Sequence, residues 1–221
     1  MPKVFIGVGH GGADSGAVSN NTKEKDLNLS IALACRDYLK KYVEVKLSRT
    51  KDENDTLSEE IKECNAFSPD LAIDIHNNAG GGDGAEVFYH YGGGTSKTLA
   101  QNILTEIVKV GQNSRGAKIR KNGDGKDYYG FIRNTKAPSV IVECAFIDNE
   151  KDIKIIDTNA ERKVMGIAIA KGILKTLGIA ETESKELYRV QIGAYSDKAN
   201  AEVMQKKIKA AGFDAIIVKV K

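Results

Sequence analysis

The sequence predicts an α/β fold, with a mainly parallel central sheet flanked by helices on both faces. Three observations support this prediction. Short apolar runs of strand length alternate with segments of helical periodicity over the first 178 residues. The strands are almost continuously apolar, which is typical of parallel strands buried on both faces. The length of 221 residues suits one such domain and a small extra module, at about 150 residues per domain.

The predicted elements follow one another in a regular order. The run KVFIGV at residues 3–8 is a strand closed by glycines, and a helix at residues 26–42 carries Leu27, Ile31 and Ala34 on one face. The remaining elements, in chain order, are a strand at 43–47, a helix at 57–66 ending before Pro69, strands at 71–75 and 85–91, a helix at 96–110, a strand at 139–142 and a helix at 160–177 ending at Gly178.

A polar stretch separates this first domain, residues 1–178, from a short tail. Residues 179–186, IAETESKE, show no periodicity and are interpreted as a linker. The tail, residues 187–221, begins again as a strand, continues as a helix at 200–211 and ends as a strand at 214–220. A β-α-β module of 35 residues is too small to bury a core alone. We therefore expect something else to complete it.

Composition excludes several classes of protein. Lys and Arg number 33 and Asp and Glu 30, so the formal net charge of +3 is too even to indicate nucleic-acid binding, although it suits a polyanionic surface. No apolar run approaches the roughly 18 residues of a membrane span, and the N-terminus lacks the pattern of a signal peptide. Three cysteines without a C-x-x-C pair exclude a disulfide framework and a cysteine-ligated zinc. We expect a chain made in the cytoplasm, without membrane insertion.

Three of the predicted strands end in a residue suited to catalysis. His10 follows the first strand, His76 the strand at 71–75 and Glu143 the strand at 139–142. The carboxyl ends of parallel strands share one edge of a sheet, so these side chains are expected to be neighbours, together with Glu24 at the start of the following helix. Two histidines and a carboxylate are the ligand set of a hydrolytic zinc site, and a second carboxylate can act as general base.

Each of these residues also has a simpler interpretation. His10 alone is typical of a loop among glycines, His76 of a polar strand end, and Glu24 of a helix first turn, where acids are favoured by the dipole. Glu143 is harder to explain in this way, because a charge inside the apolar run IVECAF is costly unless it is paired or bound to a metal. The four residues together favour a metal site.

The glycines near the N-terminus allow an alternative function. Residues 7–12, GVGHGG, fit the G-x-G-x-x-G fingerprint of a dinucleotide-binding oxidoreductase, and Arg49 is placed to meet a 2′-phosphate. That fingerprint requires a helix that begins at the glycines, whereas a polar loop at residues 14–23 comes first here. The spacing therefore argues against this alternative.

Four motifs in order resemble a known family. GHGGADSGAV, KEKDLNLSIA, DIHNNA and VIVECAFIDN are similar to the zinc-dependent N-acetylmuramoyl-L-alanine amidases of the Amidase_3 type, over residues 3–178. The resemblance implies that His10, Glu24 and His76 bind Zn²⁺ and that Glu143 is the catalytic carboxylate. It implies hydrolysis of the amide between N-acetylmuramic acid and the L-alanine of the stem peptide. Asp74 replaces the usual serine of S-I-H. It is either a hydrogen-bond partner behind the metal ligands or, as we expect, a structural residue on the opposite face from the neighbours of His76.

Other polar residues near the motifs have open roles. Asn77 and Asn78 either bind substrate or turn the chain after the strand. His90 is expected at a surface strand end and Cys144 as a buried small hydrophobe. The basic run that begins at Arg115 is expected to be a solvated face, with contact to an anionic wall polymer as the alternative.

The tail resembles half of a SPOR-type peptidoglycan-binding domain. YRVQIGAYSDKANAEVMQKKIKAAGFDAIIV carries that family's V-Q-x-G-A-[FY]-S start, its A-N-A-E helix and its G-[FY]-x-A close. The resemblance implies a ferredoxin-like sheet built from two β-α-β units, so we expect two chains to pair their tails and form a homodimer. It also implies binding to glycan strands of peptidoglycan that lack stem peptides. Gln191 and Tyr195 either contact the glycan or pack against a neighbour.

These expectations describe a zinc amidase that degrades bacterial cell walls after lysis or release from the cytoplasm. Two settings fit it, a phage endolysin, which we favour, and a bacterial autolysin that acts from inside the mother cell. The alternative from a different class is a catalytically silent wall-binding protein that keeps the fold. The complete set of His10, Glu24, His76 and Glu143 argues against it.

Overall fold

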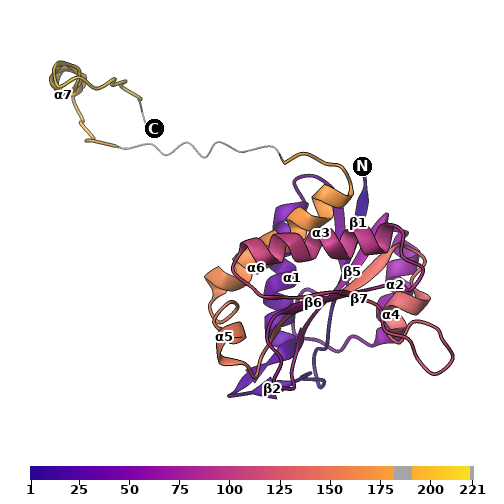
Figure 1. Ribbon diagram of the computed structural model, residues 1–221. Coiled ribbons are helices and arrows are strands. Elements are labelled where there is room, and N and C mark those ends of the chain that lie inside the picture. Colours follow the sequence, from indigo (N-terminus) through magenta and orange to yellow (C-terminus); the bar gives the residue numbers. More distant parts are fainter. Residues whose placement is uncertain (182–190, 220–221) are drawn as a thin grey trace. The chain divides into compact units, whose positions relative to one another are not determined.

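A computed structural model describes residues 1–181 and 191–219 of the chain. It divides into two compact units, Met1–Glu181 and Thr182–Lys221, and the division falls within the range interpreted as a linker. The larger unit holds a six-stranded sheet in the order β4-β1-β5-β8-β6-β7 (Figure 1). Its strands are β1 (Lys3–Val8), β4 (Glu44–Leu47), β5 (Leu71–Asn78), β6 (Ala85–Tyr89), β7 (Ser114–Lys118) and β8 (Ser139–Phe146).

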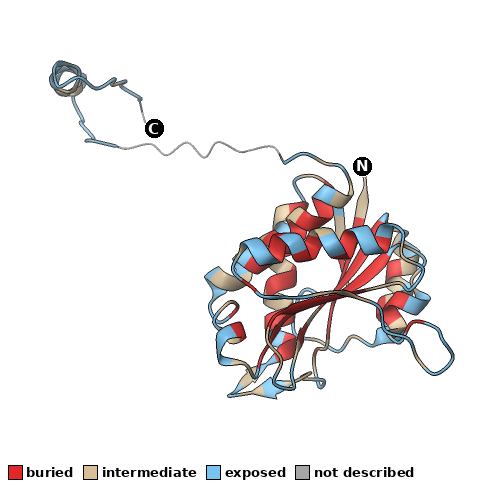
Figure 2. Ribbon diagram, viewed as in Figure 1, coloured by how far each residue is buried: buried red, intermediate tan, exposed pale blue. Residues whose placement is uncertain are grey.

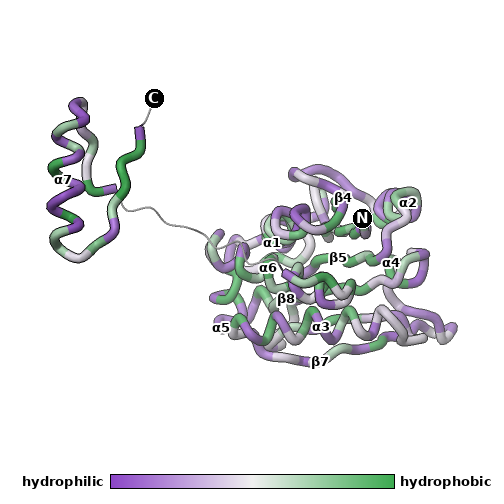
Figure 3. Tube along the Cα trace, turned by 90° about the horizontal axis from the view of Figure 1, so that it is seen from above, coloured by the Kyte–Doolittle hydropathy of each residue, from purple (hydrophilic) through white to green (hydrophobic). Residues whose placement is uncertain are grey.

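The sheet is mainly parallel, which confirms the predicted fold class. The exception is β6, which runs antiparallel to β8 while β7 runs parallel to β6. In Figure 3 the trace of β5, in the middle of the sheet, is largely hydrophobic (green), as expected for a strand covered on both faces. A separate two-stranded hairpin consists of β2 (Val18–Ser19) and β3 (Thr22–Lys23).

Six helices surround the sheet in the described part of the larger unit. They are α1 (Glu24–Leu39), α2 (Leu57–Phe67), α3 (Thr95–Lys109), α4 (Gly130–Asn134), α5 (Glu150–Ile153) and α6 (Asn159–Thr176). Two of them begin with a capping box, in which Thr56 or Thr158 and the glutamate three residues later satisfy each other's backbone N–H groups. These local signals fix where α2 and α6 start. No helix in the described residues is long and apolar enough to cross a membrane.

The two faces of the sheet are covered unequally. Helices α1, α3 and α6 pack over one face and bury the larger apolar cluster, which includes Ile31, Ile103 and Ile169. Helices α2 and α4 cover part of the other face with a smaller cluster around Phe5 and Phe131. Figure 2 shows the buried residues (red) along the strands and on the inner sides of the helices. The carboxyl ends of β5 and β8 extend past the smaller cluster, so polar side chains on that face can reach solvent.

Several elements differ from the sequence prediction. Strands β5 and β8 continue to Asn78 and Phe146, so His76 and Glu143 lie within strands rather than after them. Strand β7, SRGAK, was predicted only as part of a basic solvated run. It is an edge strand, and edge strands tolerate charged side chains because one side faces solvent. Helices α4 and α5 are too short to show a helical period.

The described residues of the smaller unit contain a helix and none of the predicted strand structure. Helix α7 (Lys198–Ala210) begins at Asp197, whose carboxylate accepts a hydrogen bond from the Ala199 N–H at 2.8 Å. The described parts of the expected strands, 191–195 and 214–219, form no ladder, and residues 187–190 and 220–221 lie outside the described residues. None of residues 191–219 is buried. Strands require hydrogen-bonded neighbours and an apolar face, and this short segment supplies neither alone.

Candidate active site

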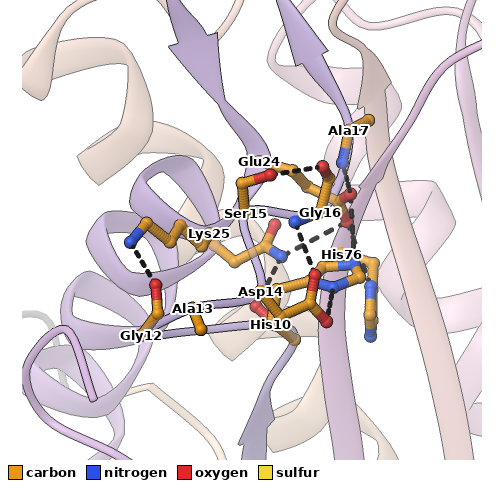
Figure 4. Close-up of polar contacts among 12 residues, drawn as sticks. His10, Gly12, Ala13, Asp14, Ser15, Gly16, Ala17, Glu24, Lys25 and His76 are labelled. Carbon is orange, nitrogen blue, oxygen red and sulfur yellow. Dashed lines mark hydrogen bonds and ion pairs between the residues drawn. The ribbon is translucent and has the colours of Figure 1, made fainter. Parts of the chain in front are cut away.

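His10, Glu24 and His76 come together at the carboxyl edge of the sheet (Figure 4). One ligand atom from each lies within 4.8 Å of the others. His10 Nε2 is 3.2 Å from Glu24 Oε2, and His76 Nδ1 is 3.0 Å from Glu24 Oε1. One carboxylate therefore lies between two imidazole rings that come from different parts of the chain.

The backbone around Glu24 fixes the position of its carboxylate. Glu24 is the first residue of α1, and the β2-β3 hairpin precedes it. The Ala17 N–H donates to Glu24 Oε2 at 2.9 Å, and the Asn77 N–H donates to Glu24 Oε1 at 3.1 Å. Both oxygens therefore have a backbone donor as well as a histidine, and the carboxylate has little freedom to rotate.

The glycines around His10 make room for the site. A Cβ atom on Gly9 would lie 2.3 Å from Cε1 of His76, and one on Gly16 would lie 2.6 Å from both Glu24 Oε2 and His10 Cδ2. Helix α1 begins at Glu24, after the loop, so its N–H groups do not face the glycines. Arg49 is buried and donates to the carbonyls of Val8 and Lys25 at 3.1 and 2.9 Å. The glycines therefore make room for the histidine cluster. A dinucleotide site does not fit this structure, because no helix begins at the glycines.

A carboxylate faces the outer nitrogen of each histidine. His10 Nδ1 is 2.8 Å from Asp14 Oδ2, and His76 Nε2 is 3.1 Å from Asp74 Oδ2. Such contacts fix the tautomer and orientation of a metal-binding imidazole. The expectation that Asp74 faces away from the neighbours of His76 is wrong, because residues two apart on a strand share a face.

The ionisation of the cluster reflects its charge pairs. Burial acts to raise the pKa of Glu24, but hydrogen bonds with His10 and His76 outweigh it and hold the pKa well below its usual value. The hydrogen bond with Glu24 raises the pKa of His10. Burial acts to lower the pKa of His76, and Asp74 and Glu24 overcome it, so that the pKa is raised. The site thus concentrates negative charge around two imidazoles, as a cation site requires.

Glu143 lies beside this cluster on the neighbouring strand. Its Cα is the register partner of His76 on β5 and of Glu86 on β6. Burial raises its pKa to about 7; the charge of His76 opposes this shift, and Glu24, Asp74 and Glu86 add to it. Its Oε2 is buried without a hydrogen-bond partner among the described residues. A carboxyl group with a pKa near neutrality can both accept and donate a proton at physiological pH.

The two asparagines after His76 have different environments. Asn77 is buried at 2% exposure, and its Nδ2 donates to Asn28 Oδ1 at 2.8 Å, which favours a structural role over contact with substrate. Period-two alternation turns its side chain to the α1 face, opposite to His76. Asn78 is half-buried, and its Oδ1 accepts from the Ala79 N–H. Its contact with substrate stays a prediction.

Other predicted residues lie away from the cluster. His90 follows β6, which runs opposite to β5, so it lies at the other end of the strands. Its Nε2 is 3.2 Å from Asp127 Oδ2. Cys144 is buried in the larger apolar cluster. Gln191 and Tyr195 belong to the smaller unit, where both are exposed, and their predicted contacts with glycan stay predictions.

Three charged groups near Glu143 form a cluster that the sequence pattern does not predict. Glu86 is buried beside Glu143 and forms ion pairs with Arg115 and Lys118 from β7. Arg115 is exposed and Lys118 is half-buried, so both keep contact with solvent, as expected, while they pair with Glu86. Their relation to Glu86 depends on the register of β6 and β7, which is irregular. A sequence pattern does not reveal such a register.

Comparisons with known proteins agree with this geometry. The Amidase_3 family, described as N-acetylmuramoyl-L-alanine amidase, matches residues 4–175, and the SPOR domain matches residues 159–219. N-acetylmuramoyl-L-alanine amidase CwlM of Bacillus licheniformis is 35% identical over 222 residues, covering 99% of this chain and 85% of that protein. The endolysin of Bacillus phage SPP1 is 32% identical over 186 residues, covering 80% of this chain and 66% of the endolysin.

A solved structure extends the similarity to the fold. The catalytic domain of CwlV, an N-acetylmuramoyl-L-alanine amidase from Bacillus (Paenibacillus) polymyxa var. colistinus, matches with a TM-score of 0.73 and 28% identity. The match covers 81% of this chain and 100% of that domain. The similarity therefore concerns the unit that contains the His-Glu-His cluster.

Proposed function

The chain belongs to the Amidase_3 family of N-acetylmuramoyl-L-alanine amidases, and we propose that its His-Glu-His cluster holds zinc with Glu143 as the general base. The enzyme is a peptidoglycan hydrolase that cleaves the amide between N-acetylmuramic acid and the L-alanine of the stem peptide. The observation that carries the proposal is the register of β5 and β8, which sets Glu143 directly beside His76.

The donor set fits a zinc ion. His10 Nε2, Glu24 and His76 Nδ1 supply two imidazole nitrogens and a carboxylate oxygen, and each outer ring nitrogen already has a carboxylate partner. Three protein ligands with one open position are typical of catalytic zinc. When bound, zinc supplies Lewis-acid chemistry, which polarises the amide carbonyl and acidifies water.

Glu143 moves the proton in the proposed reaction. As a carboxylate it accepts a proton from the attacking water. Attack on the amide carbon gives a tetrahedral species, and Glu143 then delivers the proton to the amine of L-alanine as the C–N bond breaks. The pKa of about 7 allows both transfers within one cycle.

Digestion of purified peptidoglycan tests the reaction and its metal together. We would count new L-alanine amino termini and new reducing sugar ends, with and without a zinc chelator, for the wild type and Glu143→Gln. Amino termini that appear only with metal and with Glu143 support the proposal. Wild-type activity that survives complete removal of metal contradicts the zinc centre. Binding to the wall without either product supports a catalytically silent protein instead.

We also propose that the C-terminal unit binds the wall as a homodimer. The SPOR match begins at residue 159, but residues 159–176 form α6, which packs between α1 and α3 in the larger unit. Gly166 and Gly172 allow this close packing, because a Cβ on either would lie 2.5 Å from a neighbouring backbone atom. Only the residues after α6 are therefore free to build a SPOR-like sheet.

A second copy is the occupant that best completes this unit. Its described residues include exposed apolar side chains, namely Ile192, Phe213, Ile216 and Val218. Two identical units contribute the same apolar surface and the same unpaired backbone, which a symmetric pair can bury. Gln191 and Tyr195 are the proposed glycan contacts on the resulting sheet.

Sedimentation of the full chain tests the homodimer. We expect a dimer for the wild type, a monomer for Ile216→Asp, and a dimer for the matched control Val108→Asp, whose side chain is exposed on α3 of the larger unit. A monomeric wild type at tens of micromolar contradicts the proposal. Binding to peptidoglycan should fall with Ile216→Asp through loss of avidity.

We propose that the enzyme works as an endolysin, reaching the wall after lysis or release from the cytoplasm. Its similarity to a phage endolysin supports this setting. Expression in a Gram-positive host with and without membrane permeabilisation tests it. We expect lysis only after permeabilisation. Degradation of the cell wall in hosts whose membrane has not been permeabilised would contradict the proposal.

A further inference from the structure

A cluster with an excess of positive charge lies beside Glu143, on the side away from the histidines. Strand β8 lies between β5 and β6, and Glu143 has His76 on one and Glu86 on the other as register partners. Glu86 is 5% exposed, and its Oε1 meets two cations from the edge strand β7. It accepts a hydrogen bond from Arg115 Nε and lies 3.1 Å from Lys118 Nζ. Two cations against one carboxylate leave one positive charge that the cluster does not balance.

Arg115 is held in place while its outer donors stay available. Its Nε–H donates to Glu86, and its guanidinium carbon lies 5.0 Å from the centre of the Phe146 ring. Phe146 is itself buried against Gly82, where a Cβ atom would lie 2.3 Å from the ring atom Cζ. Among the described residues, Nη1 and Nη2 of Arg115 donate to no acceptor, and the side chain is 39% exposed. A guanidinium fixed in this way presents two parallel N–H groups that suit a carboxylate.

The proposed reaction directs the stem peptide toward this cluster. Glu143 gives its proton to the amine of L-alanine, so that nitrogen lies beside Glu143 and the peptide continues from it. The histidine cluster lies on the β5 side of β8, so the peptide extends from the amine toward β6 and β7. Glu86 is one strand from Glu143, which puts the guanidinium that it binds roughly 5–10 Å from Glu143. Two residues of extended peptide span about 7 Å, which is enough to reach it.

We propose that Arg115 binds the free carboxylate of the second residue of the stem peptide and makes the enzyme selective for peptides that carry this charge. That residue is D-glutamate joined through its side-chain carboxyl, so its α-carboxylate is free unless it is amidated. The inference rests on the proposed function, because it uses the position of the leaving amine. A carboxylate accepts both N–H groups of Arg115 and meets the excess positive charge of the cluster. An amide has no charge and turns one of its own donors toward the guanidinium.

Two peptides that differ in one charge test this selectivity. They are L-alanyl-γ-D-glutamyl-L-lysine and the same peptide with the α-carboxyl of its glutamate amidated, and NMR titration measures their binding to the full chain. We expect the wild type to bind the acid about tenfold more tightly than the amide. We expect Arg115→Gln to lose this preference and to bind the amide within about twofold of the wild type. Lys97→Gln removes an exposed cation from α3, on the opposite face of the sheet, and should keep the preference.

The ratio of the two affinities separates recognition from damage to the fold. Disturbance of the β6–β7 edge would lower both affinities together, and Lys118 still pairs with Glu86 in Arg115→Gln. Hydrolysis of muropeptides in the same acid and amide forms is measured alongside, and kcat/KM should show the same preference. A wild type that hydrolyses neither form contradicts the proposed function, while the binding ratio still decides the role of Arg115. A wild type without preference for the acid, or an Arg115→Gln variant that keeps it, overturns the inference.

Discussion

His76 and Glu143 are direct register partners on the parallel strands β5 and β8. Their side chains therefore leave the sheet on the same face, although 67 positions separate them in the printed sequence. One of them is a proposed metal ligand and the other the proposed base. The relative position of metal and base is thus fixed by backbone hydrogen bonds between two strands rather than by loops.

Replacing Glu143 by glutamine should remove proton transfer and keep the site. Glutamine has nearly the same volume but cannot accept a proton from water, so we expect kcat to fall by roughly 10²–10⁴-fold. Zinc affinity should change little, because Glu143 is not among the proposed ligands. Release of L-alanine amino termini and chelator competition measure the two effects. Normal turnover in Glu143→Gln would show that another residue acts as the general base.

The raised pKa of Glu143 also predicts how stability depends on pH. Burial raises the pKa of Glu143 to about 7 from an ordinary 4.5, so the folded chain keeps a proton that the unfolded chain has lost between these values. Its carboxyl therefore lowers the free energy of unfolding as the pH rises from about 4.5 to 7. Above pH 7 this decrease has reached its full size.

Glu143→Gln removes this cost, so the variant should gain stability over the wild type as the pH rises. The gain should reach about 2–3 kcal/mol at pH 8 and vanish near pH 4. Urea unfolding of both metal-free proteins across this pH range measures it. A difference in stability that does not vary with pH would show that the carboxyl has an ordinary pKa.

The sequence was sufficient for five of the six strands, all except β7, and for the residues that meet at the carboxyl edge of the sheet. Apolar runs located β1, β5 and β8, and the rule that parallel strands share a carboxyl edge joined His10, His76 and Glu143. Glu24 was joined to them because α1 starts at that edge. These inferences depend on the direction of the strands, which short apolar runs separated by helices make predictable.

The supporting contacts could not be predicted in the same way. Asp14 and Asp74 face the outer nitrogens of the histidines, and Glu60 of α2 lies near Asp74 over Gly7. Such contacts depend on side-chain direction and on how α2 packs, which periodicity does not specify. The prediction of strands in the tail is not borne out in the described residues, for a different reason. Their pattern is that of strands, but a strand forms only with a neighbour, and the described part of one chain supplies none.

Metal removal should lower the stability of the larger unit. In the proposed site, zinc would bind the folded chain and not the unfolded chain, so free zinc at 100 times its dissociation constant should contribute about 2.7 kcal/mol. A thermal scan should show a higher melting temperature with zinc than with a chelator. His76→Ala should have the same melting temperature in both conditions. A wild type that is insensitive to zinc would contradict the proposed ligand set.

Gly9 should tolerate no side chain, because the ring of His76 occupies the space next to its Cα. A Cβ atom there would lie 2.3–2.6 Å from three atoms of the His76 ring, which is closer than atoms can approach. Gly9→Ala must therefore push the ring away from Glu24, and we expect at least a tenfold loss of zinc affinity. Gly123→Ala is the matched control, since a Cβ there meets nothing within 4 Å and should leave affinity unchanged. Chelator competition on both variants makes the comparison, and wild-type affinity in Gly9→Ala would mean that the His76 ring is not held where the site requires it.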